Sequence, residues 1–382
     1  MSVANTFTFH RPNLAESYCD SLEGKGLADS RSGLFLAAPR RTGKSTFLRE
    51  DLLPAMQKRN WTTIYVDLWA DKSKDPALLM TSAVKTKIGA FAGVITKMAK
   101  AAGLEKVNIF GALSLSLGSL ELPQGLTLAD ALEALVEAGG APVAIVIDEA
   151  QHALSTQAGV DAMFALKAAR DHLNQGSGQQ RLFIVLTGSN RDKLAHLVLK
   201  RTQPFFGSQV TRFPLLDRDF TDAYTNFVNP LLADNNQFTG EEMFEAFKLV
   251  GHRPEMLRSI VGEIALNVGA HHLGEALKGG AEEIKERMWG AMESEFAGLP
   301  DIQRAVLETI IAQGRNYVPF SEASMRAYAS LLQQEKVSTP SVQAALDALR
   351  EKGLVWRAAY GDYALEDESL TSWYKNKMQG LS

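Results

Sequence analysis

Four short apolar runs in the first two hundred residues constrain the fold most strongly. They are GLFLAA (33–38), TTIYVDLW (62–69), PVAIVIDE (142–149) and RLFIVLTGS (181–189), and QVTRFPL (209–215) is a candidate for a fifth. Each run is followed by a helical pattern. Near-continuous apolar runs are typical of strands buried on both faces, as in a parallel sheet covered by helices. The first half of the chain is therefore predicted to be an α/β domain built from right-handed crossovers.

A long segment, residues 75–140, separates the second apolar run from the third. Its first part, 76–103, has the period of a helix, and its later part, 107–125, alternates in places and carries several glycines. Glycines inside an alternating pattern are typical of turns and bulges between short strands. We therefore expect a helix followed by a β-hairpin or ribbon inserted on the α/β domain, with no motif that assigns it a role.

Helical periods replace the strand patterns after the fifth run. Three stretches, 217–228, 239–250 and 254–269, have apolar residues at helical spacing. Thr239 and Glu242 have the spacing of a capping box, which marks the start of a helix. We expect these helices to form a small lid on the α/β domain.

The last part of the chain has a different pattern. Helical stretches at 302–314, 323–334 and 341–353 come before two short strands around a turn at Gly361-Asp362. Three helices followed by a hairpin are typical of a winged helix-turn-helix domain. The predicted domains are an α/β core over 1–216, a helical lid over 217–296 and a winged helix over 297–382.

Composition narrows the cellular setting but not the partner. Hydrophobic residues make up 46% and charged residues 22% of the chain, and the formal net charge is −4, so bulk charge does not indicate a nucleic-acid or membrane partner. The first twenty residues are polar, and no apolar run approaches the roughly 18 residues that a membrane helix needs. The single cysteine, Cys19, excludes an internal disulfide and suits a reducing compartment. We expect a cytoplasmic protein.

The first apolar run leads into LFLAAPRRTGKSTFLRED, residues 34–51. This stretch matches the phosphate-binding pattern G-x-x-x-x-G-K-[ST], except that Ala38 replaces the first glycine. Such a loop places backbone N–H groups around phosphate oxygens at a helix N-terminus. Lys44 is expected to reach the β- and γ-phosphates, and the Ser45 hydroxyl to bind Mg²⁺. A chance Gly-Lys-Ser turn is the alternative. The predicted nucleotide-binding residues are Ala38, Pro39, Arg40, Arg41, Thr42, Gly43, Lys44, Ser45 and Thr46.

Two adjacent acids, Asp148 and Glu149, end the third apolar run. Uncompensated charge at the end of a buried strand costs free energy, so a partner that compensates the charge of these acids is expected. In a P-loop NTPase these acids serve Mg²⁺ and water: Asp148 would hold the metal through a water molecule, and Glu149 would polarise the attacking water. Two solvated acids at a strand end are the alternative, and the phosphate loop about one hundred residues upstream favours the catalytic interpretation.

Ser189 and Asn190 end the fourth apolar run. The carboxyl edge of a parallel sheet is where such folds bind ligands, so a polar side chain there can position water against a γ-phosphate. The residues alone leave this role and a turn with a helix cap equally open.

The order of these motifs resembles the AAA+/STAND class of P-loop ATPases, and most of all the archaeal-type ATPase family, which also occurs in bacteria. The resemblance rests on the motifs PRRTGKST, IVIDEAQ, LTGSN and GHRPEML together with the C-terminal winged helix, and it spans residues 1–382. It implies a parallel five-stranded sheet, a helical lid, a winged helix and an ATPase that uses ATP with Mg²⁺. It is also compatible with an oligomer and with slow turnover.

The resemblance also implies roles for single residues. Asn190 or Ser189 is similar to the sensor 1 residue, and 251–254 resembles the G-G-x-P lid motif, whose proline, Pro254 here, lies near adenine. Arg253 would either touch phosphate or be exposed. AAA+ relatives often complete the site with an arginine from a neighbouring subunit. Candidates for that role are Arg170, Arg191, Arg201 and Arg212.

The charge of the winged helix bears on its partner. Residues 299–382 contain nine Lys or Arg and ten Asp or Glu, a balance of −1, and acidic residues follow the Gly361-Asp362 turn. DNA-binding winged helices neutralise phosphates with basic side chains, so this balance favours a protein partner over DNA. The leading hypothesis is an ATP-hydrolysing switch with a partner-binding winged helix. The alternatives are an ATP-regulated DNA-binding or DNA-processing helper, a nucleotide-binding scaffold and, least favoured, a small-molecule kinase.

Overall fold

The structure is a computed structural model. Its described residues form two compact units, which we treat separately. The sheet unit consists of His10–Ala37 and Ser45–Phe213, and the helical unit consists of Met1–Phe9, Ala38–Lys44 and Pro214–Ser382. The structure describes residues 7–25, 28–71, 73–101, 112, 126–176, 179–199, 201–266, 273–359, 362–367 and 369–380.

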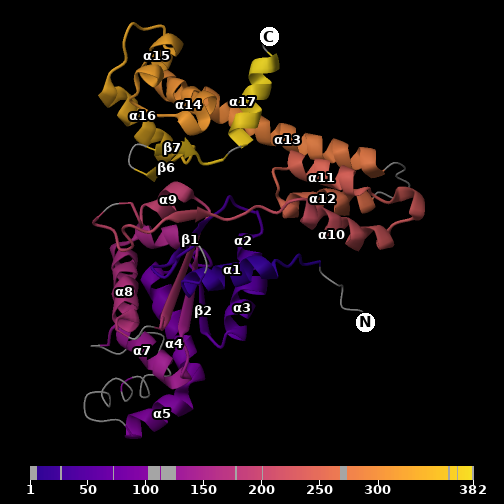
Figure 1. Ribbon diagram of the computed structural model, residues 1–382. Helices are drawn as coiled ribbons and strands as arrows, with labels where there is room; N and C mark the ends of the chain where they lie inside the picture. The colour runs from indigo at the N-terminus through magenta and orange to yellow at the C-terminus, as the bar shows by residue number, and fades with distance from the viewer. Residues whose placement is uncertain are drawn as a thin grey trace. The chain divides into compact units, whose positions relative to one another are not determined.

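The sheet unit is built on five parallel strands in the order β2-β3-β4-β1-β5 (Figure 1). All five predicted strands are confirmed, and their parallel pairing confirms the α/β class. The registers pair Asp67 with Asp148 and Ala37 with Gly188, so the polar strand ends lie at one edge of the sheet. The strands are β1 (Leu34–Ala37), β2 (Thr62–Asp67), β3 (Val143–Asp148), β4 (Leu182–Gly188) and β5 (Val210–Arg212).

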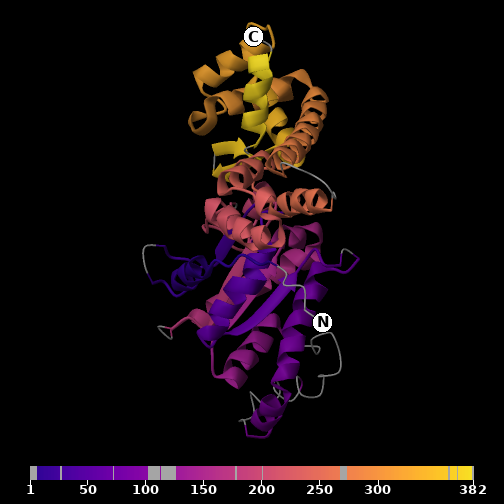
Figure 2. The ribbon, with the colours of Figure 1, turned by 90° about the vertical axis from the view of Figure 1, so that its right-hand side faces the viewer.

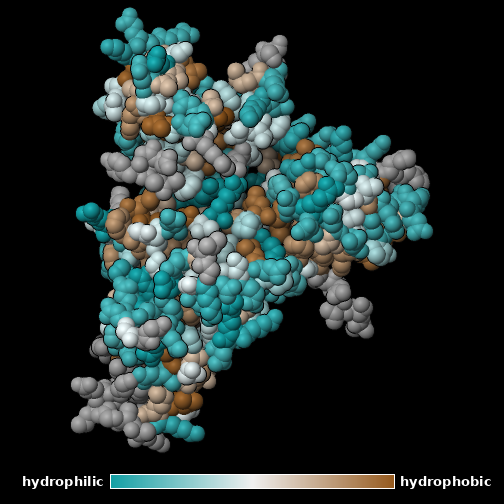
Figure 3. All heavy atoms as spheres, in the orientation of Figure 1, coloured by the Kyte–Doolittle hydropathy of each residue, from teal (hydrophilic) through white to brown (hydrophobic). Residues whose placement is uncertain are grey.

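Helices cover both faces of this sheet, as the two views in Figures 1 and 2 show. On the visible face of this unit, hydrophilic side chains predominate (Figure 3), because the helices turn their apolar sides inward. The helices are α1 (Pro12–Leu22), α2 (Lys44–Phe47), the π-helical turn η1 (Leu48–Leu52), α3 (Leu53–Lys58), α4 (Pro76–Ala90), α5 (Ala92–Ala101), α7 (Leu128–Gly139), the 3₁₀ helix η2 (Ala150–Ser155), α8 (Gln157–Asn174) and α9 (Arg191–Ala195).

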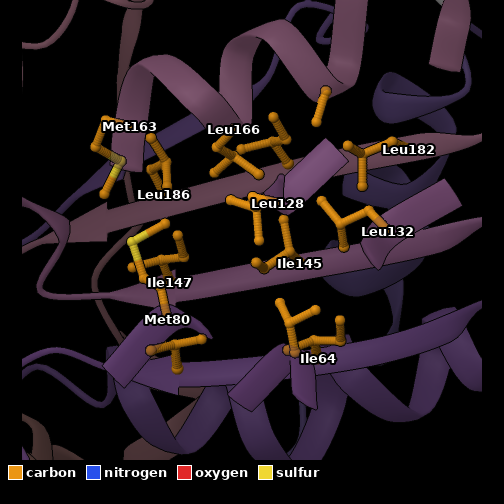
Figure 4. Close-up of a cluster of buried hydrophobic side chains, with 14 of the residues drawn as sticks. Ile64, Met80, Leu128, Leu132, Ile145, Ile147, Met163, Leu166, Leu182 and Leu186 are labelled. Atoms are coloured by element: carbon orange, nitrogen blue, oxygen red, sulfur yellow. The ribbon is translucent and has the colours of Figure 1, made fainter. Parts of the chain in front are cut away.

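The main core lies between the sheet and helices α4, α7 and α8 (Figure 4). Ile145 and Ile147 of β3 point into it and are fully buried, together with Leu186 of β4. On the opposite face, the rings of Trp61 and Phe183 stack with their centroids 3.9 Å apart. Apolar packing on both faces explains why these strands have continuous rather than alternating apolar sequences.

The helix predicted over 76–103 is divided into α4 and α5 at Phe91, with a bend of 78°. Gly89 and Gly93 flank the break, and glycine weakens a helix interior. Within the described part of the chain, no single helix is long and apolar enough to cross a membrane, although this bent pair passes the same length and composition test. The hairpin predicted over 107–125 lies outside the described residues apart from Ala112.

The lid portion of the helical unit has an aromatic core. Phe7 and Phe9 pack on Phe220, Tyr224 and Phe227, with ring centroids 5.1–6.0 Å apart. The capping box predicted at the start of α11 is present. The elements are α10 (Arg218–Val228), two 3₁₀ turns, η3 (Asn229–Leu231) and η4 (Asp234–Asn236), α11 (Gly240–Leu249), α12 (Pro254–Ala265) and α13 (Leu273–Ala297).

The remainder of the helical unit is a winged helix with one helix beyond the prediction. The elements are α14 (Asp301–Gln313), the 3₁₀ turn η5 (Gly314–Asn316), α15 (Glu322–Leu331), α16 (Thr339–Glu351), the antiparallel strands β6 (Val355–Ala359) and β7 (Asp362–Leu365), and α17 (Ser369–Gly380). Helix α17 was not predicted from the sequence. Its Trp373 packs edge-on against Phe296 of α13, with ring centroids 5.3 Å apart, which anchors the helix after the wing.

Helix α13 belongs to both parts of the helical unit. Leu277 and Ala281 near its start are buried in the lid core, whereas Phe296 near its end is buried in the winged-helix core. A single 25-residue helix therefore connects the lid to the winged helix without a flexible linker.

The only cysteine gives a test of the sheet-unit core. Cys19 is fully buried, and burial raises the pKa of its thiol to about 12 against the opposing effect of the nearby Arg59 guanidinium. Only the thiolate reacts, so at pH 8 we expect native Cys19 to react with a thiol reagent about 10³-fold more slowly than the urea-unfolded chain. The native rate should increase with pH. Equal rates in buffer and in urea would show that α1 does not pack as described.

Candidate functional site

A buried carboxylate is fixed at the end of β3. Asp148 is 1% exposed, and its Oδ2 accepts hydrogen bonds from the Ser45 hydroxyl at 2.6 Å and the Tyr65 hydroxyl at 3.2 Å. Its Oδ1 accepts bonds from the Thr187 hydroxyl and from the backbone N–H of Glu149, the latter at 3.0 Å. These donors compensate the buried charge, which would otherwise be costly. The carboxylate is therefore held in one orientation by four groups.

Two of these donors, Tyr65 and Thr187, were not predicted from the sequence. Tyr65 lies on β2 and Thr187 on β4, the strands on either side of β3. Each carries a hydroxyl group within a mostly apolar strand. A hydroxyl at such a position was the only indication in the sequence of a buried hydrogen bond. Burial, together with the charge of Asp148, raises the pKa of Tyr65, so its hydroxyl stays protonated and donates. The Arg49 guanidinium lies over the Tyr65 ring, 5.0 Å from its centroid.

Glu149 turns away from the strand in a left-handed conformation. Its φ is +54°, which is uncommon for a residue other than glycine and is often found at functional sites. Its Oε2 accepts the Ser189 hydroxyl at 2.6 Å and the side-chain amide of Gln151 at 2.5 Å. Asn190 instead caps α9, because its side chain accepts the backbone N–H of Lys193 at 2.7 Å. The structure thus brings Ser189 to Glu149 and gives Asn190 a capping contact.

The phosphate-type loop, Ala38–Lys44, is grouped with the helical unit, and peptide bonds join it to β1 and to Ser45. The Thr42 hydroxyl donates to the backbone oxygen of Pro39 at 2.8 Å, which closes a tight turn. Gly43 has a φ of +85° and Arg41 a φ of +65°. Lys44, the first residue of α2, is 5% exposed. Thr46 follows within α2 and is exposed, as are the two arginines of the loop.

The replacement of the first glycine by Ala38 is compatible with this loop. Ala38 is 1% exposed, and its φ lies outside the left-handed region that favours glycine. On the expectation that this loop binds ATP, Ala38→Gly should leave ATP affinity nearly unchanged and lower stability by about 0.4–1 kcal/mol, because glycine gains freedom in the unfolded chain. Paired calorimetric titration and melting of parent and variant measure both effects. A tenfold gain in affinity would instead mean that the alanine strains the loop.

The lid motif is also shaped by left-handed backbone. Gly251 and His252 have φ values of +68° and +56°, and the His252 Nδ1 lies 2.8 Å from the backbone oxygen of Leu216. Pro254 then begins α12. Arg253 is mostly buried rather than exposed, with its guanidinium 3.4 Å from the Asp367 carboxylate after the wing.

The four arginines considered for action on a neighbouring subunit differ in exposure. Arg191 is buried, and the guanidinium of Arg170 pairs with Asp171 at 2.6 Å. Arg201 and Arg212 are exposed, which leaves them as the accessible candidates within the described residues.

The fold and these strand ends define an α/β protein with the architecture of the P-loop ATPases. In such sheets, ligands bind beyond the carboxyl ends of the strands, where Asp148, Glu149 and Ser189 lie. No protein-family model matches the sequence, and comparison with the curated proteins also finds no match.

Solved structures with this fold extend over nearly the whole chain. A Walker-type ATPase of Pyrococcus abyssi is 21% identical with a TM-score of 0.55, covering 96% of each chain. The ORC2 protein of Aeropyrum pernix, in its ADP form, is 15% identical with a TM-score of 0.56, covering 99% of this chain and 96% of its own. These similarities establish a P-loop core followed by helices and a C-terminal winged helix as the shared architecture, at low sequence identity.

Proposed function

We propose that this protein binds ATP with Mg²⁺ and hydrolyses it, and that it acts as an AAA+/STAND-type molecular switch. The observation that carries the proposal is the 2.6 Å hydrogen bond between Ser45, at the end of the phosphate-type loop, and Asp148, directly before Glu149. It joins a hydroxyl and a carboxylate that are 103 positions apart in the sequence, in the arrangement that metal-nucleotide sites of P-loop proteins use.

The residues present fit Mg²⁺. This ion prefers oxygen ligands, keeps several waters and is usually held by one or two protein groups together with phosphate oxygens. Ser45 and Asp148 offer a hydroxyl and a carboxylate at hydrogen-bond distance from each other. They would hold the ion, and Tyr65 and Thr187 would keep Asp148 in place. When bound, the metal neutralises charge that develops on the phosphate oxygens.

The loop supplies the phosphate contacts in this proposal. Its backbone N–H groups, at the start of α2, would bind the phosphates, and Lys44 would contribute the positive charge for the β- and γ-phosphates. Arg40 and Arg41 add two exposed positive charges to the loop. Pro254, at the first position of α12, is proposed to lie near the adenine, as the lid motif implies.

Glu149 is proposed as the general base. Its carboxylate accepts a proton from the attacking water, and Ser189, bonded to it at 2.6 Å, fixes its position. Asn190 lies next to this pair in the sequence, and its side-chain amide is proposed to orient the same water. After hydrolysis, ADP remains as the second nucleotide state of the switch.

The winged helix is proposed to bind a protein partner. The first turn of α16 exposes small hydroxyl residues, and later exposed positions include Asp347 and Glu351. Lys352 and the partly exposed Arg350 lie beside these acids, so this surface has no excess of the basic side chains that neutralise DNA phosphates. Because α13 is shared by the lid and the winged helix, a change of nucleotide that moves the lid would carry the winged helix with it. The domain boundaries 216/217 and 296/297 remain part of this proposal.

ATP-regulated binding of DNA is the second candidate function. It is favoured by the winged-helix fold itself and disfavoured by its balance of nine basic and ten acidic residues. Phosphate release by the parent protein, measured with and without random duplex DNA, separates the two. Turnover indifferent to DNA, with no salt-dependent binding, supports the switch. Strong, salt-sensitive DNA binding would favour the DNA-helper function. Absence of phosphate release would indicate a nucleotide-binding scaffold without hydrolysis.

A further inference from the structure

Gln151 has an unusual environment for a glutamine. It is 6% exposed, and its side-chain N–H groups reach the Glu149 Oε2 at 2.5 Å and the Ser189 hydroxyl oxygen at 3.4 Å. Its own carbonyl oxygen, Oε1, is buried without a hydrogen-bond partner among the described residues. A buried acceptor without a partner costs free energy, so Gln151 is not explained by stability alone.

The chemistry of its neighbour determines how the amide must face. The carboxylate of Glu149 is only an acceptor, so it requires the nitrogen of Gln151 and would repel the oxygen. The oxygen is then forced to the opposite side, where it points at Gly188, the last residue of β4. The unsatisfied oxygen is thus the consequence of directing a donor at Glu149.

Gly188 provides the space for that arrangement. A Cβ built on Gly188 would lie 2.6 Å from the Gln151 Oε1 and 3.3 Å from the Leu194 Cβ. The φ of Gly188 is not in the left-handed region, so the backbone does not require glycine there. A methyl group at this position would instead collide with the Gln151 amide, so glycine allows the amide its observed position. Two sequence positions, at the ends of β4 and in η2, therefore serve the orientation of one carboxylate.

We propose that Gln151 is a positioning residue for Glu149 in ATP hydrolysis, an inference that rests on the proposed function. Together with Ser189, it directs donors at a single oxygen of the carboxylate, Oε2. This fixes the plane of a side chain whose backbone is in a left-handed conformation, so the Glu149 carboxylate is oriented to accept the proton of the attacking water. Gln151 itself touches neither water nor nucleotide in this account.

The test replaces Gln151 with Met, which has nearly the same shape and no amide. We expect kcat for phosphate release to decrease about 10–100-fold, the usual effect of losing a residue that orients a catalytic group. The Kd for ATP with Mg²⁺ should remain within about twofold of the parent value. The melting temperature should stay equal or increase, because the unsatisfied oxygen is removed. A purely structural role predicts the opposite pattern, a lower melting temperature with unchanged kcat.

Gly188→Ala is the second variant, and it removes no polar group. Its methyl displaces the Gln151 amide, so kcat should decrease in the same direction. Adding Gly188→Ala to Gln151→Ala should cause little further loss, because the clash with the amide is gone and only the 3.3 Å approach to the Leu194 Cβ remains. Gln157→Met is the matched control, since Gln157 donates to Asp161 at 2.8 Å on the exposed start of α8. It should retain parent kcat.

The outcomes separate the inference from the function on which it rests. A parent that hydrolyses ATP while Gln151→Met retains full kcat overturns the inference alone. An increase in kcat would also overturn it, because Gln151 would then restrain Glu149 rather than position it. A parent that releases no phosphate under any condition overturns the proposed hydrolysis and this inference together.

Discussion

Glu149→Gln is expected to slow ATP hydrolysis at least ~10²-fold, the usual size of a general-base contribution. The substitution keeps the shape of the side chain and its ability to accept the Ser189 hydroxyl, but it removes the charge that draws a proton from water. ATP affinity should stay close to that of the parent, because Glu149 is not among the residues proposed to bind the phosphates or the metal. Single-turnover phosphate release and calorimetric titration measure the two quantities separately.

A surface glutamate supplies the control for this experiment. Glu50 is exposed on η1, and Glu50→Gln makes the same chemical change at a residue without a proposed role. It should hydrolyse ATP like the parent. If Glu149→Gln does so too, Glu149 is not the base, and the catalytic carboxylate must be sought elsewhere.

Lys44→Ala is expected to abolish the stabilisation of the protein by ATP with Mg²⁺. A ligand present at 100 times its dissociation constant adds roughly 2.7 kcal/mol to the free energy of unfolding. Without the Lys44 ammonium, the phosphates lose their main side-chain contact, so the melting temperature should no longer increase with nucleotide. The measurement is thermal melting of parent and variant across an ATP series. Because each protein is compared with itself, any change in the stability of the nucleotide-free variant does not affect the result.

The exposed lysine at the end of α3, Lys58, is the matched control. Lys58→Ala should show the full ATP-dependent increase in melting temperature. An undiminished increase in Lys44→Ala would place the nucleotide away from the loop at residues 38–46, and would remove the basis for assigning Ser45 and Asp148 to the metal.

The sheet was predictable because its signal is local. Buried apolar residues fill β3 up to Asp148 and β4 up to Thr187, and polar residues follow, so the extent of both strands could be identified in the sequence. The helical periods of the lid and the capping box at Thr239 were similarly local. The long helix expected over 76–103 was less predictable, because Gly89 and Gly93 weaken the helix around Phe91 while the apolar residues keep a helical period through the break.

The contacts within the site were not predictable to the same degree. The contacts of Tyr65 and Thr187 with Asp148 depend on strand order, which places β2 and β4 beside β3. The contact of Gln151 with Glu149 is local, and it forms where the backbone of Glu149 is left-handed. The left-handed conformations of Arg41 and Glu149 have no signature in residue type, since neither is glycine. Ser189 and Asn190 were equivalent in the sequence, and only the register and the turn after β4 give Ser189 the contact with Glu149.

Calorimetric titration of the parent protein with ATP, in the presence and absence of Mg²⁺, is the most direct test of nucleotide binding. We expect one ATP per chain and tighter binding with Mg²⁺, since Ser45 and Asp148 are proposed to hold the ion beside the phosphates. Absence of ATP binding under both conditions, or an affinity that does not respond to Mg²⁺, would contradict this expectation.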